Sequence, residues 1–340
     1  MDKLFDYKNA SKYAYSIAKI RSYETKLLGR DKVLRMMSAD DASECFRLLE
    51  EAGYNVSLGD RNNFTPILQR ENEKSLSTVK LLAKDDRVHD LLATRYDFHN
   101  LKVALKEFFS KEELPEGYQA GGILSTRDIK SSVFEEDFKK VGEGHGGLIN
   151  AYSEAVKAFS DDPAPRLIDI VVDKLMYEDL LRRAKEIGNN FLTRLFVREI
   201  DLINIRTFFR LRYLHKKRMD FSEAFFPGGD FQIDFFLKNY EDDFHMLKTI
   251  FKGTEFLELI TDGSTYIEEK KSFLRFERII SEYFIKYVRA TKWISFGIEP
   301  IIAYYYAKEK EIKVVRMILT GKQNELSYDD IKEGVPDEYI

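Results

Sequence analysis

Apolar residues recur at helical spacing along most of the 340-residue chain. Phe98, Leu101 and Leu105 follow one another at intervals of three and four, which places them on one face of a helix. Leu202 and Ile205 begin a similar stripe further along the chain. Alternating strand patterns joined by Asn-Gly or Asp-Gly turns are nearly absent. The pattern therefore predicts an all-α protein.

Capping signals place several helix ends. Ser38 and Asp41 have the spacing of a capping box, and Gly53 follows as a helix stop. Ser327 and Asp330 repeat this arrangement near the C-terminus. Short helices are expected after each pair.

Glycine- and proline-rich segments indicate boundaries between helices. Residues 142–147 are expected to form a flexible hinge, and residues 161–165 a turn between helices. A weaker boundary is expected at residues 252–253 together with 262–264, where Asp-Gly is a candidate turn.

A motif of about 105 residues' period is the main sign of internal repetition. Two segments share the order acidic, apolar, any, Asn, apolar, basic, at an offset of 104 residues. A diverged third copy is placed 107 residues further on, with Lys308 at the Asp position and Glu311 at the Asn position. The polar residues of the three copies are Asp97, Asn100 and Lys102; Asp201, Asn204 and Arg206; and Glu311 and Arg316.

Two interpretations of these polar residues stand side by side. They could hydrogen-bond locally or to an adjacent helix inside each copy. They could instead line a shared polar cavity where the copies meet and contact a partner, since polar groups beside a core must be satisfied.

The composition narrows the range of functions. The net charge of −4, with acidic and basic residues interspersed, does not favour nucleic acid as a partner. A single cysteine, Cys45, excludes an internal disulfide and is expected to pack in a core, which fits the cytoplasm. No signal peptide is expected, and the most apolar stretch, residues 293–307, contains Glu299 and Pro300 and is too short to span a membrane.

Motifs that carry chemistry are missing. The chain has no phosphate-binding loop of the Gly-x-x-x-x-Gly-Lys-[Ser/Thr] type and no Gly-x-Ser-x-Gly elbow. Its five histidines form no metal-binding pair, and its carboxylate pairs are adjacent in sequence, as on solvated helix faces. We expect no catalytic residue, no cofactor and no metal.

Several segments together resemble the C-type (d-type) subunit of prokaryotic V/A-type ATPases. The segments lie at residues 13–21, 26–29, 95–102, 173–177, 199–206 and 308–316. They occur in order and cover nearly the whole chain.

The resemblance implies three similar helical domains in a pseudo-threefold funnel with a central cavity. The expected units are residues 1–147, 148–252 and 253–340. The family role implied is that of a non-catalytic rotor subunit, which binds the central-shaft subunits and the ring of membrane rotor subunits and transmits torque. The implied location is cytoplasmic and peripheral to the cell membrane, without a span of its own.

The resemblance also assigns the eight polar residues of the repeats to partner binding in the cavity. Two other functions, of different classes, compete with that of a rotor subunit. One is a cytosolic helical-repeat scaffold with other partners; the other is a helical enzyme, phosphohydrolase-like, with a site assembled from distant residues.

Overall fold

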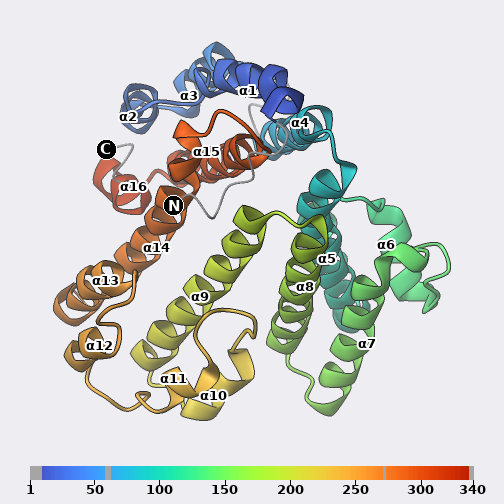
Figure 1. Cartoon of the computed structure of the whole chain (residues 1–340), viewed down its shortest axis with the longest axis vertical. Helices are drawn as coiled ribbons and strands as arrows, with labels where there is room; N and C mark the ends of the chain where they lie inside the picture. The colour runs from blue at the N-terminus through green and yellow to red at the C-terminus, as the bar shows by residue number, and fades with distance from the viewer. Residues whose placement is uncertain (1–9, 58–62, 271–272, 337–340) are drawn as a thin grey trace. The chain divides into compact units, whose positions relative to one another are not determined.

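Helices form all the regular structure in the computed structural model, which describes residues 10–57, 63–270 and 273–336 (Figure 1). No strand occurs in these ranges, so the all-α prediction is confirmed. The α-helices are α1 (Ala10–Glu24), α2 (Arg30–Ser38), α3 (Ala42–Glu51), α4 (Thr65–Ala83), α5 (Asp86–Ser110), α6 (Thr126–Glu135), α7 (Gly146–Asp161), α8 (Pro165–Ile187), α9 (Asn190–Tyr213), α10 (Arg218–Ala224), α11 (Ile233–Leu237), α12 (Phe244–Ile250), α13 (Leu257–Lys270), α14 (Leu274–Arg289), α15 (Glu299–Gln323) and α16 (Tyr328–Gly334). The described residues also contain the short 3-10 helices η3 (Pro115–Gly117), η4 (Glu143–His145) and η5 (Ala290–Trp293).

The predicted capping signals are confirmed at one end of the chain and corrected at the other. Ser327 and Asp330 form a reciprocal capping box at the start of α16. Ser38, in contrast, is the last residue of α2. Asp41 alone caps α3, because its side chain accepts hydrogen bonds from the N–H groups of Ser43 and Glu44.

The structure confirms some of the predicted boundaries between helices and contradicts others. The turn at 161–165 is confirmed, since α7 ends at Asp161 and α8 begins at Pro165. Residues 143–147 form η4 and the first residues of α7. The Asp-Gly turn at 262–263 is wrong, because both residues lie inside α13. A Cβ at Gly263 would lie 2.1 Å from Cδ2 of Phe276, so this glycine allows α13 to pack closely on α14.

The chain divides into two compact units. The first contains Leu76–Ile200 and Phe226–Asp230, and the second contains residues 10–75, Asp201–Phe225 and residues 231–336. Two boundaries fall within α4 and α9, and the two that flank Phe226–Asp230 fall in the connection between α10 and α11. The predicted division into three domains, at residues 147 and 252, follows the sequence repeat and not compactness. It stays a prediction.

The first unit is built around α8. This helix packs against α5 and α7, and α6 packs against α5. Leu101 and Leu105 of the predicted α5 stripe are fully buried, as are Ile168 and Val172 of α8. The stripe therefore forms part of the core, as its spacing predicts.

Two of the hydrophobic cores in the described part of the second unit draw on different helices. One is rich in phenylalanine and joins α9–α14; Phe208, Phe221 and Phe236 lie at its centre with ring centroids 5.3–5.5 Å apart. The other joins residues 28–68 to residues 312–335.

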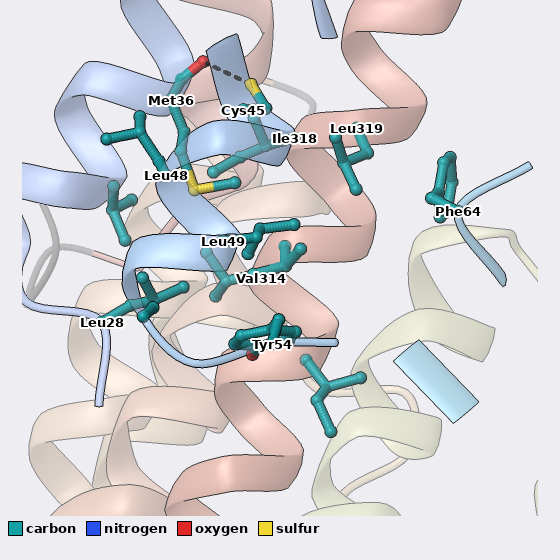
Figure 2. Close-up of a cluster of buried hydrophobic side chains, with 14 of the residues drawn as sticks. Leu28, Met36, Cys45, Leu48, Leu49, Tyr54, Phe64, Val314, Ile318 and Leu319 are labelled. Atoms are coloured by element: carbon teal, nitrogen blue, oxygen red, sulfur yellow. Dashed lines mark hydrogen bonds between the residues drawn. The ribbon is translucent and has the colours of Figure 1, made fainter. Parts of the chain in front are cut away.

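Figure 2 shows this second core, where Leu48 and Leu49 of α3 lie near Val314 and Ile318 of α15. Cys45 is fully buried in it, and its thiol lies 3.3 Å from the carbonyl oxygen of Met36. The packing role predicted for Cys45 is confirmed.

Candidate partner-binding site

Asp97 lies in the middle of α5 and is 1% exposed. Its carboxylate accepts hydrogen bonds from the N–H groups of Ile123 (3.2 Å) and Leu124 (3.1 Å). A Cβ on Gly122 would come within 2.1 Å of Oδ1 of Asp97, so only glycine lets the loop approach this closely. Burial raises the pKa of Asp97 to about 7, although both hydrogen bonds act in the opposite direction.

Asn100 holds the preceding part of the same loop. Its Nδ2 donates to the carbonyl oxygen of Gln119 and its Oδ1 accepts from the N–H of Gln119, both at 2.8 Å. Beside it on the helix, Nε2 of His99 lies 2.9 Å from the carbonyl oxygen of Gly117. The polar residues of the first copy therefore fasten the loop after α5 to the helix.

Asp201 has the same role in the second copy. It is fully buried and accepts a hydrogen bond of 3.2 Å from the N–H of Phe231. Phe231 comes three residues after Gly228, and Leu124 comes three residues after Gly121; both glycines have φ of +104°. Asn204 is also fully buried. The two loops thus share a left-handed glycine and a buried aspartate acceptor.

Glu311 is the buried acid of the third copy, at 1% exposure. It accepts hydrogen bonds from the N–H of Leu28, from the hydroxyl of Tyr54 (2.6 Å) and from Nζ of Lys308 (2.7 Å). Lys308 also pairs with Glu71 at 2.8 Å. These groups form a buried charged cluster, defined as Tyr54, Glu71, Lys308 and Glu311, and its residues come from both ends of the chain.

The structure corrects the register of the third copy. Asp97 and Asp201 each lie eleven residues after the first residue of their helix, and Glu311 lies twelve residues after Glu299. Each of the three is followed fourteen residues later by a residue in the left-handed conformation. Those residues are Lys111, His215 and Glu325, with φ of 58°, 53° and 56°.

Glu311 therefore corresponds to the aspartates and not to the asparagines. In this register Val314 occupies the asparagine position, and Arg316 matches the basic residues Lys102 and Arg206. The sequence pattern was misleading because Lys308 lies three residues before the acid on the same helix, at the spacing that separates Asp from Asn in the other copies.

The basic residues of the motif lie in different environments. Lys102 is partly buried and pairs with Asp173 of α8 at 2.6 Å. Arg206 is half-buried and Arg316 is exposed. Lys102 therefore joins two helices of the first unit, whereas Arg316 is accessible to a partner.

Four further acids are buried among the described residues, and none of them is a predicted site residue: Glu71, Glu107, Asp179 and Glu299. Glu107 on α5 accepts from the N–H of Leu114, from the hydroxyl of Tyr118 and from Lys130. Glu71 belongs to the buried charged cluster. Neither Glu107 nor Glu71 lies in the repeated motif, so a search for the motif could not find them.

The arrangement organises loops and joins helices. Asp97, Asn100, Asp201 and Glu311 all direct their polar atoms at groups of the chain itself. Among the described residues no cluster of three or more His, Cys, Asp or Glu is placed to bind a metal. Within the same ranges no helix is long and apolar enough to cross a membrane.

Comparison with known proteins gives matches along nearly the whole chain. A family model described as ATP synthase (C/AC39) subunit matches residues 16–334. The C-type subunit of the V-type sodium ATPase of Enterococcus hirae is 23% identical over 322 residues, which cover 94% of this chain and 97% of the relative. The corresponding subunit of the A-type ATP synthase of Haloquadratum walsbyi is 24% identical over 346 residues, covering 94% and 96%. That of Haloferax volcanii is 22% identical over 339 residues, covering 94% and 95%.

Proposed function

Because the chain belongs to the ATP synthase (C/AC39) subunit family, we propose that it is the non-catalytic C-type rotor subunit of a V/A-type ATPase. In this role it links the central shaft to the ring of membrane rotor subunits. It transmits the torque that couples ATP hydrolysis or synthesis to H⁺ or Na⁺ transport.

The family match over residues 16–334 is the observation that carries this proposal. The three relatives are covered over more than nine-tenths of their length, so the match is not confined to one shared domain. The matched region thus has the extent of a whole subunit of this family.

We propose further that the repeat builds three similar helical units around a central cavity, as in a funnel with pseudo-threefold symmetry. The equivalent long helices are α5, α9 and α15, which have 25, 24 and 25 residues. Residues 28–68 would complete the third unit, since they share a core with residues 312–335.

The motif residues divide into two roles in this proposal. The buried Asp97, Asn100, Asp201, Asn204 and Glu311 keep the long helices and their loops in place. The basic residues Arg206 and Arg316, which are accessible to different degrees, contact the shaft. Lys102 contributes indirectly through its ion pair with Asp173.

Affinity purification of the tagged chain from its own cells tests the main proposal. The shaft subunits and the ring subunits are expected to co-purify with the tag after mild detergent extraction. Absence of both sets would overturn the proposal and favour a scaffold with other partners.

Charge reversal tests the contact residues. Arg316→Glu is expected to weaken binding to the isolated shaft subunits by about tenfold or more, because a rim charge at an interface acts through electrostatic complementarity. Lys313→Glu makes the same change at an exposed position on α15 and serves as the control. Equal affinities of wild type and both variants would remove Arg316 from the interface.

A further inference from the structure

A cavity of about 390 Å³ lies within the second compact unit, and none of the eight polar residues predicted to bind a partner lines it. Its wall comes from three parts of that unit: the α1–α2 connection, the end of α14 with η5, and α15. A volume of this size suits a small molecule.

Positive charge dominates the polar part of the wall. Arg30, Arg289, Lys292 and Lys310 line the cavity, and Glu24 is the one acid among its lining residues. Arg21 offsets the charge of Glu24 through an ion pair of 2.8 Å. The cavity therefore favours an anion with more than one negative charge.

The position of Lys310 adds to this preference. Its side chain is among the buried ones, at 6% exposure, whereas Arg30, Arg289 and Lys292 are exposed. A charge removed from water attracts an anion more strongly than a surface charge does, because the local dielectric is lower. Gly29 and Arg30 begin α2, and N–H groups at a helix start also favour anions.

Apart from Gly29 and Thr291, the rest of the wall is apolar. Leu27, Leu28, Ile285, Val288, Ala303 and Ala307 supply it. An inorganic anion would leave this surface without a partner, whereas a molecule with an apolar portion would cover it. The cavity thus combines four cations with a hydrophobic wall.

We infer that this cavity binds an organic phosphate, a small molecule that carries a di- or triphosphate group on an apolar or aromatic body. The phosphates contact Lys310 and the three exposed cations, and the body packs on Ile285, Val288 and the alanines of α15. Binding joins the α1–α2 connection to α14 and α15. The inference is independent of the rotor assignment.

Calorimetric titration of the isolated full-length chain tests the inference, with ATP, ADP, pyrophosphate and adenosine as probes. ATP and ADP are expected to bind at one site per chain, pyrophosphate more weakly, and adenosine not measurably. Lys310→Met and Arg289→Ala are each expected to weaken ADP binding by about tenfold or more.

Lys313→Met removes an exposed cation of the same helix that does not line the cavity, and it should leave ADP binding unchanged. Arg289→Ala keeps the test valid if Lys310→Met does not fold, because Arg289 is exposed. Absence of saturable binding, adenosine binding as tight as ADP binding, or an equal loss in Lys313→Met would each overturn the inference.

Discussion

Asp97 shows how one buried carboxylate can position a loop. Its two oxygens accept N–H groups of consecutive residues, Ile123 and Leu124, which would otherwise be difficult to satisfy next to a core helix. The loop reaches the helix only because Gly122 has no side chain. The acid and the glycine are therefore a single structural device.

Replacement of this glycine tests the device. Gly122→Ala is expected to destabilise the protein by about 1–3 kcal/mol, because its Cβ would overlap the carboxylate of Asp97 and push the loop away. The fall in thermal unfolding temperature measures the effect. Gly146→Ala is the control, since a Cβ there meets nothing within 4 Å. Equal unfolding temperatures for the two variants would contradict the argument.

The pKa of Asp97 makes a separate prediction about pH. Burial raises this pKa from 3.8 to about 7, so the folded state holds a proton that the unfolded state has lost between these values. The contribution of Asp97 to stability is complete below pH 3.8 and is lost as the pH rises to about 7. A shift of this size corresponds to about 4 kcal/mol at most.

Comparison with Asp97→Asn isolates this contribution, because asparagine does not titrate. The stability of the wild type relative to the variant, measured by chemical denaturation, should fall between about pH 4 and about pH 7 and then level off. A difference that stays constant across this range would show that the pKa of Asp97 is not raised.

The sequence could identify Asp97, Asn100 and Asp201 as special but could not identify their partners. A polar residue next to an apolar stripe is visible from spacing alone. Its partners here are backbone groups of Gln119, Leu124 and Phe231, and every non-proline residue offers the same N–H group. The choice between local bonding and a shared cavity therefore needed coordinates.

Helix α15 buries more charged side chains than α5 or α9, the other two long repeat helices. Lys308 lies between Glu71 and Glu311, and its ammonium group also sits 4.4 Å from the ring centroid of Tyr54. All of these side chains are buried. The ammonium group keeps two buried carboxylates compatible with each other.

Removal of this ammonium group should be costly. Lys308→Met is expected to lower the free energy of unfolding by about 3–5 kcal/mol, because buried Glu311 and Glu71 lose the ammonium group between them and Glu71 retains its pair with Lys74. Lys313→Met, at an exposed position on the same helix, should change it by less than about 0.5 kcal/mol. Chemical denaturation measures both. A loss in Lys308→Met as small as that of the control would mean that the cluster is not strongly coupled.

A comparison of α5, α9 and α15 explains why the sequence pattern places the third repeat three residues out of register. The first two copies are recognisable because Asp and Asn occur three residues apart in both. In α15 valine replaces the asparagine, and Lys308 and Glu311 reproduce the three-residue spacing by another route. Only the helix ends and the left-handed residues after them fix the alignment.

At the scale of the whole molecule, the two ends of the chain depend on each other. Residues 28–57 and 63–68 share one hydrophobic core with α15 and α16, in which Met36, Leu48 and Leu49 are buried. Hydrophobic periodicity predicts each helix but not this pairing, since it carries no information on which distant face covers which.

A truncated chain tests this dependence through the single thiol. Burial raises the pKa of Cys45 to about 11, so the folded protein should react with a thiol reagent only slowly at about pH 8. Removal of residues 299–340 takes away the covering helices, and labelling of Cys45 should become at least about tenfold faster.

The full-length chain in denaturant gives the upper limit of the labelling rate. Labelling of the truncated chain at the slow rate of the intact protein would show that residues 28–68 form a closed core without α15 and α16.

The buried cluster and this shared core also set an order of events during translation. Residues 28–68 leave the ribosome early, whereas their partners at 312–335 are made much later. Until then Leu28 has no Glu311 to accept its N–H, and the core that contains the methionines of α2 lacks the apolar side chains of α15 and α16. Folding of this part therefore waits until α15 and α16 have been made, and the nascent N-terminal helices are natural clients for a chaperone.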